Sequence, residues 1–303
     1  SSAMRIWMTG ASGFVGRPLT DFLRARGHTV IALPRIGSEA ARPTWKLVGE
    51  PDAVLHLAGE NIAQRWNDKV KERIYQSRVR GTHWLSEALA KLPKKPHALI
   101  CASGSAFYGS RGEEILDEQS NPGTGFLARL TQHWEAAAES ARVAGIRVVH
   151  MRIGLVLHPK GGALAKMLPA FRAGLGGKLG GGKHYWSWIA LPDMLAAIEF
   201  ILNNSRLHGG VNMVGPNPVT NAEFTKTLGA VLHRPTIFTA PRFTLRWMMG
   251  EMADEALLTS FRIIPRKLQE AGFTFQLPDL RAALEFLLNN APAKTDVAVV
   301  KNS

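Results

Sequence analysis

The chain has 303 residues, of which 46% are hydrophobic and 20% charged, so the sequence is that of a globular protein and not of a disordered or fibrous one. Its formal net charge of +13 favours anionic ligands. No nucleic-acid partner is expected, because the basic residues are interleaved with acidic and apolar ones and aromatic-basic recognition signatures are absent. No apolar run is long enough to span a bilayer, so no membrane partner is expected either.

The sequence predicts a cytoplasmic protein. Its single cysteine, Cys101, excludes an intramolecular disulfide and fits a reducing compartment. The N-terminal stretch SSAMRIWMTGASG enters a strand at once and lacks the organisation of a signal peptide. Whether the chain forms a homo-oligomer is left open by the sequence.

Strand and helix patterns alternate through the first half of the chain. Amphipathic helices are predicted at residues 14–26 and about 67–91, and a third begins at about residue 125. Apolar strands are predicted before and between them, at residues 4–10, 28–35, 52–60, 97–106 and 146–157. This alternation, with strands that are apolar throughout, predicts an α/β fold built on a Rossmann-type doubly wound parallel sheet.

The second half begins with a glycine-rich but apolar segment. The phrase TNAE, which starts at Thr220, is a capping box that opens a helix, and two further helices are predicted at residues 242–256 and 280–290. We therefore predict two domains. A Rossmann domain spans residues 4–157, and a smaller, mainly α-helical domain on the substrate side spans residues 158–296 and can return strands to the main sheet.

The stretch GASGFVG follows the first predicted strand and opens the first predicted helix. Gly10 permits a tight turn, Gly13 lets backbone amides approach a pyrophosphate, and Gly16 allows helix and strand to pack closely. In this βαβ setting the stretch predicts a dinucleotide-binding loop; a glycine-rich turn without a ligand is the alternative. The predicted cofactor contacts in the loop are Gly10, Ser12, Gly13, Phe14 and Val15.

The spacing Gly-x-x-Gly-x-x-Gly resembles that of the short-chain dehydrogenase/reductase superfamily. The phrases HLAGE (56–60), GTHWLSEAL (81–89) and ASGSAFYG (102–109) resemble segments of its extended, epimerase-like branch. Longer phrases, among them LAGENIAQRW, SRVRGT, WEAAA and NPVTNAEF, are similar to the atypical NAD(P)-dependent epimerase/dehydratase-like group. The resemblance covers nearly the whole chain and implies a small C-terminal helical segment.

The end of the second predicted strand bears on the choice of nucleotide. A carboxylate there would bind the ribose hydroxyls of NAD, but this strand ends in Pro34-Arg35, and Glu39 lies too far along the chain. An arginine at this place accommodates a 2′-phosphate, so we predict NADP(H) as the cofactor. An exposed arginine without a ligand is the alternative.

Further cofactor contacts are expected at the carboxyl ends of the strands, where ligands of open α/β sheets lie. Leu57, Ala58 and Gly59 should flank the adenosine ribose, and Leu157 should lie near the nicotinamide. Arg78 lies in the SRVRGT phrase. Pointing inward, its guanidinium would meet cofactor phosphate or substrate; pointing outward, it would belong to a solvated basic face.

The catalytic dyad that the resemblance implies, a tyrosine followed four residues later by a lysine, is absent. In the extended branch a glutamate often lies four residues after the lysine, and Glu135 fits that place. Counting back puts Thr131 at the lysine and Leu127 at the tyrosine, and a slip of one gives Leu130 and Phe126. Neither register supplies a tyrosine or a lysine.

The catalytic candidates are Ser103, Ser105 and Tyr108, with His184 or a water molecule as the alternative proton donors. The serine of the superfamily falls on Gly104, between the two serines, and each of these can equally satisfy backbone groups at a strand end. Without a nearby cation Tyr108 is a poor base, because a free tyrosine has a pKa of about 10. Its alternative role is that of a packed aromatic.

A polar or anionic small molecule is the expected substrate. His184, Tyr185 and Trp186 follow the glycine-rich run, with Lys178 and Lys183 nearby, and in the extended branch this region faces the substrate. No spacing of metal ligands is found, so no metal is expected.

Three functions are compatible with these features. The first is an NADP-dependent epimerase or reductase that acts on a carbonyl or nucleotide-sugar-like substrate through an unusual acid. The second is a non-catalytic NADP(H)-binding redox sensor or scaffold, which the missing dyad favours. The third is an anion or nucleic-acid binder on a reductase fold, which only the net charge supports.

Overall fold

The computed structural model describes residues 2–34, 49–57 and 64–289. Its centre is a six-stranded sheet in the order β10-β5-β4-β3-β1-β2, in which every neighbouring pair is parallel. The strands are β1 (Arg5–Thr9), β2 (Thr29–Ala32), β3 (Ala53–His56), β4 (Ala98–Gly104), β5 (Arg147–Ile153) and β10 (Gly209–Met213). The predicted Rossmann-type parallel sheet is therefore confirmed.

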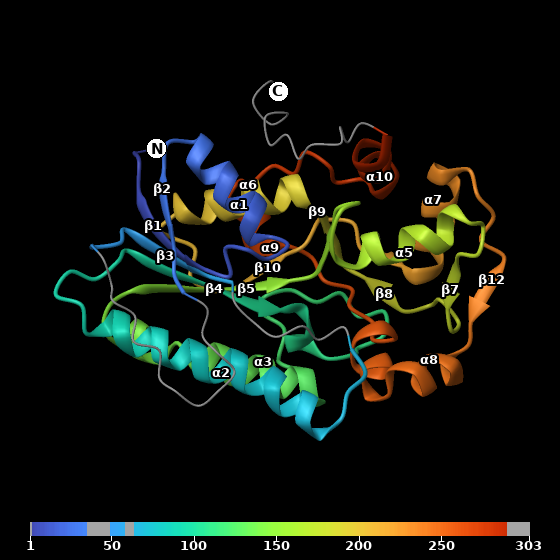
Figure 1. Ribbon diagram of the computed structural model, residues 1–303, viewed down its shortest axis with the longest axis horizontal. Coiled ribbons are helices and arrows are strands. Elements are labelled where there is room, and N and C mark those ends of the chain that lie inside the picture. Colours follow the sequence, from blue (N-terminus) through green and yellow to red (C-terminus); the bar gives the residue numbers. More distant parts are fainter. Residues whose placement is uncertain (1, 35–48, 58–63, 290–303) are drawn as a thin grey trace.

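Helices cover both faces of this sheet (Figure 1). One face carries α1 (Gly16–Ala25) and α6 (Leu191–Leu202), and the other carries α2 (Asp68–Ala90), α3 (Phe126–Ala136) and α4 (Glu139–Val143). The residues of β1 alternate between the two faces. Ile6 and Met8 pack under α1 and α6, whereas Trp7 packs under α2 and α4, and all three are fully buried. Burial on both faces explains why the strands are apolar throughout.

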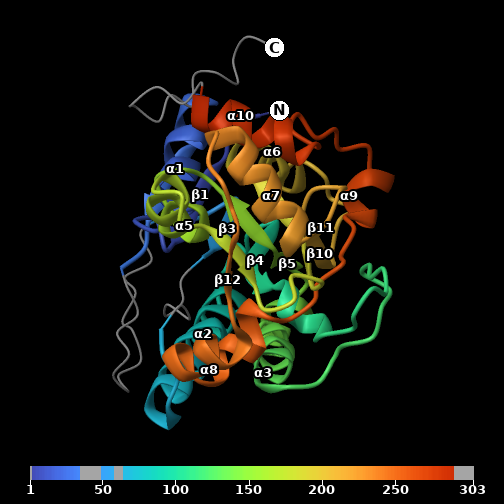
Figure 2. The ribbon, with the colours of Figure 1, turned by 90° about the vertical axis from the view of Figure 1, so that its right-hand side faces the viewer.

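The second half starts at the carboxyl end of β5 and is built on short strand pairs. These are β6 (Leu155–Leu157) with β9 (Trp188–Ala190), β7 (Gly177–Leu179) with β12 (Phe238–Ala240), and β8 (Tyr185–Trp186) with β11 (Val219–Thr220). Three helices pack around them, α5 (Gly162–Arg172), α7 (Asn221–Leu232) and α10 (Leu280–Asn289). α7 and α10 lie side by side (Figure 2). Thr220 Oγ1 accepts the N–H of Glu223 at 3.1 Å, which is the predicted cap of α7.

The chain returns from this half to the main sheet. β10 lies beyond residue 158 but pairs with β5, from Gly209 opposite Val149 to Met213 opposite Ile153. The division into domains at this boundary stays a prediction. None of the helices in the described ranges is both long enough and apolar enough to cross a membrane.

The helix predicted at residues 242–256 is two elements. α8 (Arg242–Met249) stops at Gly250, whose φ of 62° cannot continue a helix, and a π-helical turn, η2 (Ala253–Leu257), follows. These elements lie next to the N-terminal ends of α2 and α3 (Figures 1 and 2), where Lys71 pairs with Glu251 at 2.8 Å. The C-terminal segment thus packs against the helix that should carry the dyad.

Candidate functional site

The loop between β1 and α1 has the geometry that its glycines predict. Gly10 has a φ of 71°, and a Cβ atom on Gly16 would lie 1.9 Å from the carbonyl oxygen of Gly10. Only glycine therefore lets the helix begin this close to the strand. Ser12 and Gly13 are exposed at the tip of the loop, and Val15, the N-cap residue, makes no side-chain cap. A helix that starts directly after a tight glycine loop can present free N–H groups there, and such helix starts bind a pyrophosphate.

Phe14 joins this loop to the second half of the chain. Its ring lies against the backbone of Gly161 and Gly162 at the start of α5, where a Cβ atom on Gly161 would come within 2.3 Å of the ring. The ring centroid also lies 6.5 Å from that of His158. Contact of Phe14 with a cofactor stays a prediction. Its ring packs the start of α5 against the glycine loop.

A buried histidine at the end of β3 joins the strands below the loop to the helices behind them. His56 Nδ1 lies 2.6 Å from Thr9 Oγ1, and His56 Nε2 lies 2.9 Å from Thr82 Oγ1 on α2. Trp134 Nε1 on α3 donates to the same Thr82 hydroxyl at 3.1 Å. Burial lowers the pKa of His56 to about 4, so its ring is neutral near pH 7. Sequence reasoning missed this residue, although a histidine in an apolar strand was a visible signal.

The predicted adenosine contacts begin directly after β3. The N–H of Leu57 donates to the Oγ1 of Thr9 at 3.1 Å, so Leu57 lies beside the start of the glycine loop. Ala58, Gly59 and Arg35 lie outside the described residues. Their contacts with a cofactor stay predictions.

Arg78 on α2 is turned toward α3. Its guanidinium carbon lies 5.2 Å from the ring centroid of Trp134, and its Nη1 donates to the carbonyl oxygen of Ile74 at 3.4 Å. The side chain is thus partly buried between helices, and its predicted contact with a phosphate or a substrate stays a prediction. Leu157 is fully buried in the apolar core of the second half, so its backbone is the part that can face a nicotinamide.

The positions at which the resemblance places the dyad carry a leucine and a threonine and lie beside β4. Leu127 and Thr131 are 6% and 3% exposed, and the Thr131 hydroxyl donates to the carbonyl oxygen of Leu127 at 2.6 Å. A Cβ atom on Gly104 would lie 4.0 Å from Thr131 Oγ1. The positions that match the superfamily's lysine and serine therefore face each other as threonine and glycine.

A carboxylate from the C-terminal segment caps the helix that carries these positions. Glu255 Oε1 accepts the N–H of Phe126 at 3.0 Å, and its Oε2 accepts the N–H of Leu127 at 3.3 Å. A negative charge is favoured at a helix N-terminus. A pocket of about 120 Å³, lined by the connection between β4 and α3 and by η2, opens beside Leu127. Sequence reasoning missed Glu255, because 128 residues separate it from Leu127.

A buried polar network engages two of the three predicted catalytic residues. Ser103 Oγ donates to Glu135 Oε2 at 3.0 Å, and Arg152 holds both oxygens of that carboxylate. Arg152 Nη1 also donates to the Tyr108 hydroxyl at 3.0 Å, which in turn donates to Asn212 Oδ1 at 2.7 Å. Burial raises the pKa of Tyr108 to about 12, so this hydroxyl keeps its proton near neutral pH.

The third catalytic candidate, Ser105, and two of the three substrate candidates, Tyr185 and Trp186, are partly exposed, whereas His184 is buried. Ser105 is partly exposed at the first position of η1 (Ser105–Tyr108), directly after Gly104. His184 is buried, its pKa is lowered by that burial, and its Nε2 has no hydrogen-bond partner among the described residues. Its ring lies 6.1 Å from that of Trp186, and the guanidinium of Arg262 lies 4.5 Å from the ring centroid of Tyr185.

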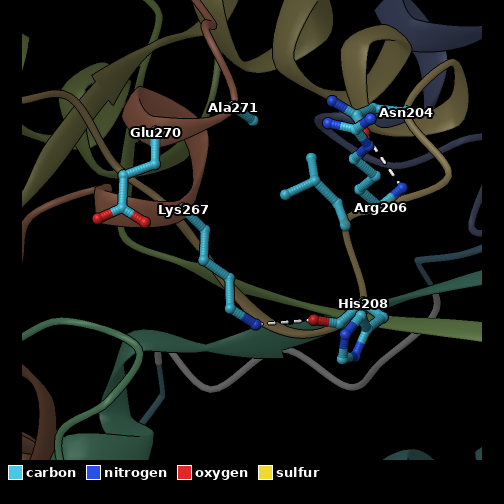
Figure 3. Close-up of a pocket in the computed structure, with 7 residues that line it drawn as sticks. Asn204, Arg206, His208, Lys267, Glu270 and Ala271 are labelled. Carbon is cyan, nitrogen blue, oxygen red and sulfur yellow. Dashed lines mark hydrogen bonds between the residues drawn. The ribbon is translucent and has the colours of Figure 1, made fainter.

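A separate pocket lies at the other end of the sheet. It has a volume of about 320 Å³ and is lined by the connection between α6 and β10 and by α9 (Arg266–Glu270). Lys267 Nζ donates to the carbonyl oxygen of His208 at 2.7 Å across it (Figure 3). Because His208 precedes β10, this pocket lies at the amino ends of the parallel strands and not at the glycine loop. In the described part of the chain, no three His, Cys, Asp or Glu side chains are arranged to hold a metal ion.

The parallel sheet and the glycine loop before α1 define a Rossmann-type nucleotide-binding protein. The chain belongs to the NAD dependent epimerase/dehydratase family, whose profile matches residues 6–215. Residues 240–287 match a second profile, described as a domain of unknown function, DUF1731. The resemblance to the epimerase-like short-chain dehydrogenases/reductases is thereby confirmed, and a nicotinamide dinucleotide is the cofactor of this family.

Similar proteins match the chain over almost its full length. Epimerase family protein Mb2239 of Mycobacterium bovis is 41% identical, covering 92% of this chain and 96% of its own. Epimerase family protein SDR39U1 of Homo sapiens is 36% identical, covering 93% of this chain and 99% of its own. The crystal structure of the human protein (isoform 2) with NADPH superposes with a TM-score of 0.85 at 33% identity, covering 95% of this chain and 100% of that one.

Proposed function

We propose that this protein binds NADP(H) at the loop between β1 and α1 and uses it in a reductase or epimerase reaction. The carrying observation is the close approach of Gly16 to the Gly10 carbonyl, where only a glycine fits, so that α1 starts directly beside the glycine loop. Helix starts of this kind bind a pyrophosphate. The family supports a nicotinamide dinucleotide, and the human relative, crystallised with NADPH, supports the phosphorylated form. Arg35 supports the same choice by its place in the sequence.

We propose a polar or anionic small molecule with a carbonyl group, such as a nucleotide sugar, as the substrate. Lys178 and Lys183 supply positive charge near the glycine-rich segment. His184 supports a polar substrate, since its buried Nε2 has no partner among the described residues and an unpaired buried nitrogen is costly. Tyr185 and Trp186 would supply the walls of this site.

A reaction here needs an acid other than the superfamily's tyrosine. We propose Ser105, because Ser103 and Tyr108 already donate their protons to Glu135 and Asn212 inside the protein. Ser105 is partly exposed and directly follows Gly104, the position that corresponds to the superfamily's serine. Ser103 and Tyr108 would then hold the strand end in place.

The second candidate function is a redox sensor or scaffold that binds NADP(H) without turnover. The burial of Leu127 and Thr131 at the dyad positions favours it, because neither side chain can exchange a proton with a substrate. Such a protein would still need the glycine loop.

Two turnover assays distinguish the two candidates. Carbonyl compounds are offered with NADPH, and oxidation is followed at the nicotinamide band; nucleotide sugars are offered with NADP+, and epimeric products are followed by chromatography, because an epimerase returns the hydride and leaves the cofactor unchanged. Turnover that Ser105→Ala lowers, with unchanged NADPH affinity, is the expected result. Tight NADPH binding without either reaction for any compound of the panel would favour the sensor. Failure to bind NADPH would overturn both.

A further inference from the structure

Large apolar side chains that face solvent gather on one segment of the molecule. In the described part of the chain, eight large hydrophobic residues are mostly exposed, and five of them lie between residues 237 and 248. We call these five the α8 patch: Ile237, Phe238, Phe243, Trp247 and Met248. Exposed apolar groups gathered in this way mark a surface that binds something, whereas single exposed ones carry no such meaning.

The helix under the patch is anchored, so its outer face is not exposed by fraying. Phe243 and Trp247 are four residues apart, which puts them on one face of α8, and they are 74% and 77% exposed. On the opposite side Met249 packs against the apolar cluster that contains Trp66. The carbonyl oxygen of Trp247 also accepts a hydrogen bond from Arg65. The backbone of α8 is thus held while its aromatic side chains stay uncovered.

The segment that carries the patch is basic, in a chain whose net charge is +13: residues 233–250 contain Arg234, Arg242 and Arg246 and no aspartate or glutamate. Arg246 pairs with Asp254 of η2 at 3.0 Å, so the attraction for an anionic surface rests on Arg234, Arg242 and the net charge of the chain. A helix with aromatic residues on one face and arginines at its border is typical of segments that lie in the interface of a membrane. Anionic lipid headgroups attract such arginines. A second copy of this chain would instead bring a second net charge of +13 to the same place.

We propose that the α8 patch docks the protein on an anionic lipid surface. Phe243 and Trp247 enter the boundary between headgroups and acyl chains, and Arg242 contacts lipid phosphates. The sequence predicted no membrane partner because no apolar run can span a bilayer, but peripheral docking needs no such run. This proposal is independent of the proposed enzymatic function.

Cosedimentation with vesicles tests the proposal. The wild type, the double variant Phe243→Ser/Trp247→Ser and the control Val143→Ser/Leu175→Ser are compared on phosphatidylcholine vesicles with and without phosphatidylserine. Val143 and Leu175 are 73% and 61% exposed but lie outside the patch, so the control removes exposed apolar side chains elsewhere on the surface. We expect the wild type and the control to bind the anionic vesicles, to release them at high salt, and to bind phosphatidylcholine alone at least about tenfold more weakly. The patch variant should lose at least about tenfold in affinity for the anionic vesicles while it keeps its NADPH affinity and its melting temperature.

Three outcomes overturn the proposal. The wild type sediments with neither kind of vesicle; the patch variant binds anionic vesicles as well as the wild type does; or the control loses as much affinity as the patch variant. Sedimentation equilibrium completes the test. A dimer that only the patch variant loses, without binding of the wild type to vesicles, assigns the patch to a second copy of the chain and so rejects the lipid.

Discussion

Arg152 on β5 and Glu135 on α3 form a two-pronged ion pair inside the protein. Arg152 Nη2 lies 2.9 Å from Glu135 Oε1 and Arg152 Nε lies 3.1 Å from Oε2, and the two side chains are only 8% and 11% exposed. The pair ties α3 to the sheet behind the positions of the missing dyad. A complete buried pair of this kind changes the free energy of folding little, because the attraction of the charges offsets the loss of their hydration. Removal of one partner destabilises the fold strongly.

Glu135→Gln should therefore destabilise the protein by about 3–5 kcal/mol, because the guanidinium of Arg152 stays buried without its counter-charge. Urea unfolding measures the loss. Glu139→Gln is the control, since Glu139 pairs with Arg142 on the surface and its removal should have no measurable effect. Equal losses of unfolding free energy in the two variants would show that the buried Glu135–Arg152 pair contributes no more to stability than the surface pair does.

Gly16→Ala should abolish tight NADPH binding. The Cβ atom of the new alanine would lie 1.9 Å from the Gly10 carbonyl oxygen, so the start of α1 must move away from the loop. A pyrophosphate would then lose its contact with the start of the helix. A shift of this kind costs about 1–3 kcal/mol of packing energy. Fluorescence titration with NADPH gives the affinity. Gly181→Ala, where a Cβ atom meets nothing within 4 Å, should bind normally. Unchanged NADPH binding by Gly16→Ala would move the pyrophosphate site elsewhere.

Arg35→Ala should weaken NADPH binding far more than NADH binding. A charge-assisted contact with the 2′-phosphate is worth about 1.5–3 kcal/mol, which is roughly one to two decades of affinity. The dissociation constants for NADPH and NADH are measured on the wild type and the variant. The fold-change for NADPH divided by that for NADH gives the contribution of the 2′-phosphate contact. The same fold-loss for both nucleotides contradicts the assignment of Arg35.

His56 should make the protein less stable as the pH falls below about 6.5. Its folded pKa of about 4 lies below the ordinary 6.5, so the unfolded chain takes up a proton in this window and the folded chain does not. Its contribution is fully present above pH 6.5 and is lost toward pH 4, at up to about 1.4 kcal/mol per pH unit. Unfolding free energies of the wild type and His56→Gln are compared from pH 4.5 to 7.5.

The difference between these two proteins should shrink with acid, and His83→Gln should keep the slope of the wild type, because His83 is half exposed and outside this network. A constant difference across the range would mean that His56 has the same pKa in the folded and the unfolded protein. The tautomer is immaterial to this result, since both ring nitrogens have hydroxyl partners.

Periodicity predicted the elements of the first half well. The helix expected at residues 14–26 is observed as Gly16–Ala25, and the strand expected at 97–106 as Ala98–Gly104. These patterns are local, because burial on one or both faces of an element repeats along the chain with the period of that element. The helix expected at 242–256 was too long, since Gly250 adopts a positive φ there and ends α8.

The candidate site was only partly visible from the sequence. The glycine loop was predicted because its constraints act between residues six apart, such as Gly10 and Gly16. The cap that Glu255 places on α3 was not, and neither was the bond from Tyr108 to Asn212, whose partners are 104 residues apart. Asn212 lies in a short run that shows no periodicity, and only its pairing beside β5 brings it to Tyr108.

The sequence by itself determined the parallel sheet and the resemblance to a family that uses a nicotinamide dinucleotide, because both depend on residue types at short, fixed spacing. The tertiary structure alone decided that Ser103 and Tyr108 are held in a buried network, and that the aromatic face of α8 stays uncovered. These properties depend on which elements, distant in the sequence, pack together. The topology of the chain determines that packing, and a local pattern of apolar and polar residues does not predict it.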